Sequence, residues 1–129
     1  MILLNRAKHL YSDKYIISAN IKFELDGMYL YENNRWVECE EETRSINFGE
    51  MLDKDGKKIF ASLSEDGKGG DTLYAQEWDS EGDLREDIYR NIVCVYYKQE
   101  FMLTRKIKDE VFYFGWNYFI NKEIVGIQK

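Results

Sequence analysis

The chain has 129 residues, of which 44% are hydrophobic and 33% charged, a balance that indicates one globular domain over residues 1–129 rather than a disordered chain. Its net charge of -6 disfavours direct binding to nucleic-acid phosphates, which requires clustered lysine and arginine. The apolar run at the N-terminus, Met1 to Leu4, is too short for a signal peptide or a membrane span, so we expect a cytoplasmic protein.

Aromatic residues make up 16% of the chain, and they favour the pleated, half-buried surface of a β-sheet. Proline is absent, and turn signals built from Gly, Asn and Asp recur at intervals of roughly ten residues, which is typical of all-β domains. We therefore predict an antiparallel meander with turns at Asp26–Gly27, Asn33–Asn34 and Asp53–Gly56. The predicted strands are 21–25, 28–32, 35–38, 58–61, 72–78, 92–97, 101–104, 111–120 and 123–128.

One short helix is predicted over residues 81–91, with Ser80 as its N-cap. Leu84 and Ile88 lie four residues apart, so they would share one side of the helix and pack it as a lid on the sheet. The preceding stretch 64–71 contains three glycines and two carboxylates next to each other, and we interpret it as an exposed loop that buries nothing.

No pattern in the sequence predicts a catalytic, metal or cofactor site. His9 is the sole histidine, and Cys39 and Cys94 have no neighbouring ligand, so we interpret both cysteines as buried thiols, although one bridge between them is open. Residues 53–56 resemble the start of a calcium loop but lack its later ligands. Residues 67–72 resemble a phosphate loop without its required glycine spacing. A catalytic pair cannot be singled out among 24 acidic residues.

Aromatic residues stand on both faces of two predicted strands, at 96–97 and 112–114. One face is expected to join the core, and the other needs a cover, which is the helix, a partner or a ligand.

Residues 36–60, WVECEEETRSINFGEMLDKDGKKIF, resemble the YopX family of small phage and prophage proteins. The matching features are the Trp36–Val37 strand, the Glu41-Glu42-Thr43 step and the turn at 52–60. The family continues with Glu-Gly-Asp-Ile-Val, whereas here a Gly-Asp-Thr-Leu comes only at 70–73, which implies an insertion of about ten residues. The resemblance implies a partly open, SH3-like β-barrel with a small helical addition. It lends no catalytic residue.

Together these features predict a phage- or prophage-encoded accessory protein in a bacterial host cytoplasm, acting by non-enzymatic binding to a host or phage macromolecule. An inhibitor of a host defence protein is one form of this function. We expect a protein partner, no cofactor, no nucleic acid and no membrane, and a homo-oligomer is left open. The predicted contact is the acidic edge Glu40, Glu41 and Glu42, facing a basic partner. The alternatives are a small-molecule or nucleotide-binding barrel, an acidic DNA mimic, and a minor enzyme with a carboxylate pair.

Overall fold

The structure is a computed structural model that describes residues 2–78 and 84–129. Within these ranges strands make up most of the chain, and the helical elements are two short 3-10 turns, which confirms the predicted mainly β class. No helix in the described residues is long and apolar enough to cross a membrane. The elements are β1 (Leu3–Lys8), β2 (Tyr15–Ser18), β3 (Ile21–Glu24), β4 (Gly27–Glu32), β5 (Arg35–Cys39), η1 (Glu41–Thr43), β6 (Ser45–Phe48), β7 (Ala61–Ser62), β8 (Asp71–Trp78), β9 (Leu84–Tyr97), β10 (Glu100–Ile107), β11 (Glu110–Gly115), η2 (Trp116–Tyr118) and β12 (Phe119–Ile127).

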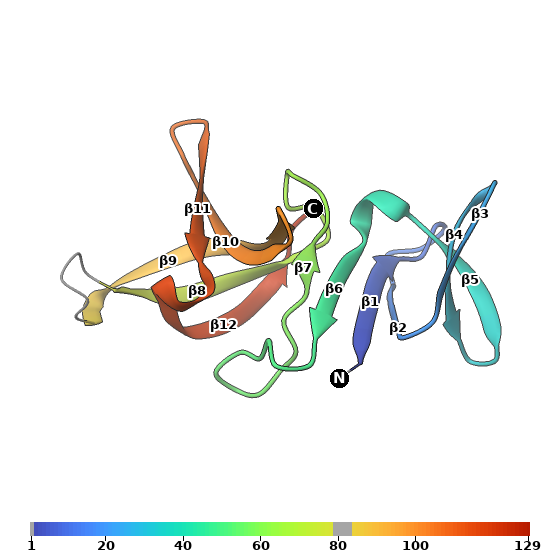
Figure 1. The fold of residues 1–129 in the computed structure, drawn as a ribbon, viewed down its shortest axis with the longest axis horizontal. Helices are drawn as coiled ribbons and strands as arrows, with labels where there is room; N and C mark the ends of the chain where they lie inside the picture. The colour runs from blue at the N-terminus through green and yellow to red at the C-terminus, as the bar shows by residue number, and fades with distance from the viewer. Residues whose placement is uncertain (1, 79–83) are drawn as a thin grey trace.

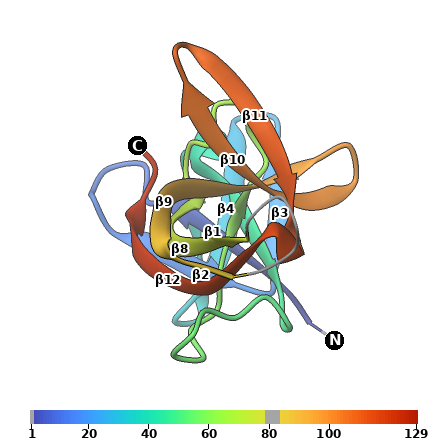
Figure 2. The same ribbon diagram turned by 90° about the vertical axis from the view of Figure 1, so that its left-hand side faces the viewer.

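Nine strands form one sheet in the order β11-β10-β9-β7-β6-β1-β2, and β8 joins β12 to β9 beside this path. The long strand β9 connects the parts, because its Val93 pairs with Thr72 of β8 on one edge and with Thr104 of β10 on the other. Strands β8, β9, β10 and β12 curl about one another, so that this end of the sheet closes into a partly open barrel, as predicted (Figures 1 and 2).

The main hydrophobic core lies inside the curl, and each of the four curled strands contributes at least one buried side chain to it. Leu73, Ile92, Leu103 and Phe119 are fully buried there. Burial of each such side chain contributes about 1.5–3 kcal/mol, so the alternation of inward and outward residues along these strands drives the closure.

A second sheet, in the order β3-β4-β5, stands at the far end of the molecule from the barrel (Figure 1). Its inner face packs on β1 and β2 and encloses a separate hydrophobic cluster, which includes Ile16, Met28 and Leu30. The predicted turn at Asn33–Asn34 joins β4 to β5, and both residues have the positive φ of a type I′ hairpin, 51° and 66°. The meander over residues 21–39 is therefore confirmed, but its first turn is Leu25–Asp26, one residue before the predicted Asp26–Gly27, because Glu24 pairs with Gly27 across the hairpin.

The helix predicted for residues 81–91 is wrong over its described part, because residues 84–91 belong to β9; residues 80–83 lie outside the described residues. The spacing that suggested a helix is ambiguous, since residues four apart also share one face of a strand. Contacts across the sheet decide the outcome. The ring of Tyr89 stacks on Tyr74 of β8 at 5.0 Å, and Arg90 Nε lies 3.0 Å from Glu77 Oε2.

The glycine-rich stretch 64–71 is packed into the molecule, so the expectation that it buries nothing is also wrong. Gly67, Gly69 and Gly70 are buried beside β9 and the end of β12. Gly69 has φ +83°, and a Cβ there would collide with the carbonyl oxygen of Thr43. Only glycine meets both conditions, because it lacks the Cβ and adopts positive φ at little cost.

A buried ion pair ties this stretch to the first strand. Arg6 Nη2 lies 2.9 Å from Asp71 Oδ1 and donates a hydrogen bond to the carbonyl of Gly69 at 2.9 Å. The guanidinium also lies 4.5 Å from the centre of the Phe60 ring. Burial raises the pKa of Asp71, and the charge of Arg6 partly offsets the rise. The pair therefore links the two ends of the fold where they meet.

Candidate functional site

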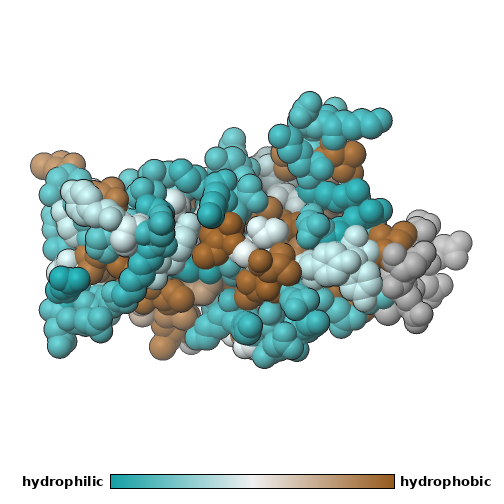
Figure 3. Space-filling view, turned by 180° about the vertical axis from the view of Figure 1, so that it is seen from behind, coloured by the Kyte–Doolittle hydropathy of each residue, from teal (hydrophilic) through white to brown (hydrophobic). Residues whose placement is uncertain are grey.

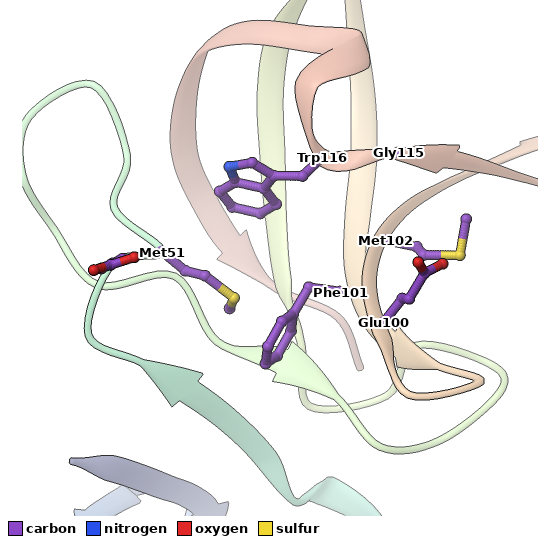
Figure 4. A pocket seen from close by; sticks show the side chains of 7 residues that line it. Met51, Glu100, Phe101, Met102, Gly115 and Trp116 are labelled. Carbon is purple, nitrogen blue, oxygen red and sulfur yellow. The ribbon is translucent and has the colours of Figure 1, made fainter. Parts of the chain in front are cut away.

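The candidate site is an open groove of about 480 Å³ between the barrel and the loop that follows β6. We call it the groove; it is lined by Glu50, Met51, Glu100, Phe101, Met102, Gly115 and Trp116. Three segments contribute these residues: the loop after β6, the start of β10, and the junction of β11 with η2. The last two are the paired ends of one hairpin, and the loop after β6 lies far from them in the sequence. Figure 4 shows the rings of Trp116 and Phe101 and the side chain of Met51 directed into the space between these segments.

The floor of the groove is apolar and continuous with the main core. Met51 belongs to the buried cluster, and Phe101 and Trp116 pack against it. The ring of Phe101 is held by Tyr96 at 4.9 Å and, edge to face, by Phe48 at 5.4 Å. Because neighbours already fix these rings, a ligand would meet a preformed surface and would not have to order it.

The ring of Trp116 has a lysine over one of its faces. Lys122 Nζ lies 4.5 Å from the centre of the Trp116 ring and donates a hydrogen bond to the carbonyl of Phe119 at 2.7 Å. Burial lowers the pKa of Lys122. The lysine is thus a fixed support for the indole ring.

The backbone of the loop that carries Met51 is equally well held. Met51 N–H donates to the carbonyl of Phe48, and the carbonyl of Met51 accepts from Ile59 N–H at 2.7 Å and from Asn47 Nδ2 at 3.0 Å. Asn47 is fully buried, and its Nδ2 also donates a hydrogen bond to the carbonyl of Ile59 at 2.7 Å, so this amide group ties the two sides of the loop together. The loop therefore presents a defined wall to the groove.

The rim of the groove is acidic. Glu50 and Glu100 are both exposed, and neither carboxylate has an ion pair or a side-chain hydrogen bond with any described residue. Gly115, at the mouth, has ordinary extended backbone with φ −63°, and a Cβ there would meet nothing within 4 Å. Figure 4 shows the side chain of Glu100 on the other side of β10 from the Phe101 ring, so the carboxylates flank the aromatic floor. An aromatic floor flanked by carboxylates suits a cation with an apolar stem, which is the chemistry of a lysine or arginine side chain.

The predicted contact residues Glu40, Glu41 and Glu42 lie elsewhere, at the end of β5 and in η1. Glu40 Oε1 is 3.2 Å from Lys8 Nζ, and Glu42 Oε1 is 3.9 Å from Lys68 Nζ. These lysines offset two of the three carboxylates, which weakens the attraction of this edge for a basic partner. A contact at Glu40, Glu41 and Glu42 therefore stays a prediction. The negative charge at the groove rim is offset less, because no lysine or arginine of the described residues pairs with Glu50 or Glu100.

The structure bears on the metal, calcium-loop and cysteine patterns of the sequence. No group of three His, Cys, Asp or Glu residues in ranges 2–78 and 84–129 could hold a metal ion. Asp53 Oδ1 accepts the backbone N–H groups of Asp55 and Lys57, both at 2.9 Å, so the calcium-like sequence forms a turn. Cys39 and Cys94 are free, buried, and in different hydrophobic clusters, and burial raises the pKa of both thiols.

Sequence reasoning missed the groove, although it noted the surplus of aromatic residues. Of the predicted aromatic strands, Phe114 packs on the core and Tyr113 stacks on Tyr97 at 4.3 Å, whereas Phe112 stays 41% exposed. The signal available in the sequence was the pair Gly115–Trp116. Glycine has no side chain, so it leaves space around the large ring beside it.

No family model, curated protein or solved structure matches the chain.

Proposed function

We propose that this chain is a non-enzymatic binding protein whose groove takes a lysine or arginine side chain from a partner protein. The observation that carries the proposal is the proximity of an aromatic floor, Phe101 and Trp116, to the carboxylates of Glu50 and Glu100, which have no ion pair within residues 2–78 and 84–129. The phage or prophage origin, and action on a host or phage macromolecule, are part of the proposal and rest on the resemblance in residues 36–60. Inhibition of a host defence protein is one form of this role.

Both halves of a basic side chain would find a partner in the groove. The methylene stem would cover the ring of Trp116 or Phe101, an apolar contact that contributes about 0.8 kcal/mol for each buried CH₂ group. The charged end would reach a rim carboxylate, and a hydrogen bond to a charged group contributes about 1.5–3 kcal/mol. A neutral apolar side chain would keep only the first contact, so the groove should prefer the cation.

Short peptides that carry one lysine or arginine between apolar residues test this preference, with methionine at the same position as the matched comparison. Tryptophan fluorescence reports binding, and Trp116→Phe identifies the signal from the groove. We expect the basic peptides to bind more tightly than the methionine peptides, and the double variant Glu50→Lys/Glu100→Lys to lose this preference.

The triple variant Glu40→Lys/Glu41→Lys/Glu42→Lys is the control, since it reverses three charges outside the groove. It should bind the basic peptides as the parent does. Loss of binding in the triple variant with retention in the rim variant would move the contact to the predicted edge. Equal binding of basic and methionine peptides would refute a cation-binding groove.

A further inference from the structure

Strand β11 is an edge of the large sheet, and among the described residues its only strand partner is β10. The β10–β11 hairpin stands out from the body of the molecule in both ribbon views (Figures 1 and 2). One side of β11 therefore presents a row of backbone N–H and C=O groups to solvent, which is the template on which another strand can pair.

This edge lacks the features that usually prevent such pairing. Its sequence, EVFYFG over residues 110–115, has no lysine, no proline and one charge, which lies at its end. Val111 is 45% exposed and Phe112 is 41% exposed, although the strand is otherwise rich in side chains suited to a sheet interior. Figure 3 shows brown, hydrophobic side chains on the hairpin below its teal tip. By contrast, the edge strand β3 has Lys22 and Glu24 on either side of Phe23.

The charges on the hairpin point to the occupant of this edge. The tip carries three cations, Arg105, Lys106 and Lys108, and two carboxylates, Asp109 and Glu110, so its net charge is +1. Lys106 Nζ lies 3.9 Å from Asp109 Oδ1, which leaves Arg105 and Lys108 as the cations without an ion pair among the described residues. The base of the same hairpin adjoins the acidic groove rim, because Glu100 begins β10 and Gly115 ends β11. An antiparallel copy of the hairpin would place its basic tip at this acidic base, and the twofold axis would repeat the contact at the other end.

We propose that β11 pairs antiparallel with β11 of a second copy of this chain, so that each basic tip lies at the groove rim of the other copy. Pairing centred between Phe112 and Tyr113 sets Glu110 of one copy beside Gly115 of the other. The two Glu110 side chains then lie at opposite ends of the paired strands, each at the groove mouth of the other copy, where Lys108 offsets its charge. Lys108 of the second copy then comes next to the groove, near Glu100. Lys108 of the second copy would take the position of a partner's basic side chain, so a second copy and a partner protein compete for one groove.

Analytical ultracentrifugation of the purified chain tests the pairing. We expect a concentration-dependent dimer in the parent and a monomer in Phe112→Lys, because a lysine on the edge strand opposes strand addition. Phe23→Lys is the matched control: it makes the same substitution at an exposed position, on the charged edge strand β3, and it should leave the dimer intact. If the parent protein is still a monomer at about 1 mM, the dimer dissociation constant exceeds about 1 mM, which corresponds to a binding free energy weaker than about −4 kcal/mol. That result would overturn the proposal. Equal association of the two variants would do the same.

A charge swap separates the contact from any effect on folding. Lys108→Glu and Glu100→Lys should each weaken the dimer about tenfold, because each change breaks the attraction at both symmetric ends. The double variant should recover most of the loss; a double variant that is weaker than either single one would refute the arrangement. Peptide binding by the monomeric Phe112→Lys protein tells the two proposals apart, since the groove would still bind basic peptides if only the dimer were wrong.

Discussion

Replacement of Arg6 by methionine would test whether the buried ion pair holds the two ends of the fold together. The side chain of Asp71 is 1% exposed and that of Arg6 9% exposed, so the pair is almost fully removed from water. The variant keeps an apolar side chain of similar length but leaves the Asp71 carboxylate without its cation and the Gly69 carbonyl without its donor. Removal of one partner of a buried pair costs about 3–5 kcal/mol, a large share of the stability of about 5–15 kcal/mol typical of a domain.

The cost should depend on pH in a defined direction. Burial already raises the pKa of Asp71 above its value in the unfolded chain, and loss of Arg6 would raise it further. A carboxyl group with a raised pKa binds its proton more tightly in the folded state, so stability falls as pH rises through the interval between the two pKa values. The deficit of Arg6→Met relative to the parent should therefore be largest near neutral pH and should shrink as the pH falls toward the unfolded value of about 3.9.

Urea unfolding at several pH values, followed by tryptophan fluorescence, measures both effects. Arg90→Met is the control, because Arg90 Nε lies 3.0 Å from Glu77 Oε2 but its side chain is 35% exposed. A pair so open to solvent should contribute no more than about 1 kcal/mol. If Arg6→Met lowers the free energy of unfolding by less than about 1 kcal/mol, or by an amount that does not change with pH, the ion pair does not hold the two ends of the fold together.

Three further outcomes follow from the backbone and the core. Gly69→Ala should cost at least about 3 kcal/mol more than Gly56→Ala in urea unfolding, because both have φ near +80° but only the former meets a carbonyl oxygen, that of Thr43. Replacement of Lys98–Gln99 by Asn-Gly should raise the free energy of unfolding by about 1 kcal/mol, because both positions have positive φ and Asn-Gly suits a type I′ turn. An unchanged or lower free energy of unfolding would contradict this. The two buried thiols should react with a thiol reagent only as fast as the chain unfolds, and rapid labelling of the folded protein would contradict their burial.

Hairpin turns show where local sequence was informative and where it was not. Asn33–Asn34 was found because asparagine readily adopts positive φ. Lys98–Gln99 and Lys108–Asp109 adopt similar angles, and their composition gives no comparable signal. In these two turns the pairing of β9, β10 and β11 imposes the backbone shape, and the turn residues accept the strain.

The amino-acid sequence alone determined the mainly β class, the meander over residues 21–39 and the turn at Asp53–Gly56, because each depends on side chains within a few residues of one another. Tertiary structure decided the rest. Residues 84–91 became a strand through pairing with β8, and the glycine-rich stretch became buried through contacts with Thr43 and Arg6. The groove joins residues about 50 to 65 positions apart in the chain, and its aromatic floor and acidic rim exist only once the sheet has closed, since no local pattern records which distant segments will meet.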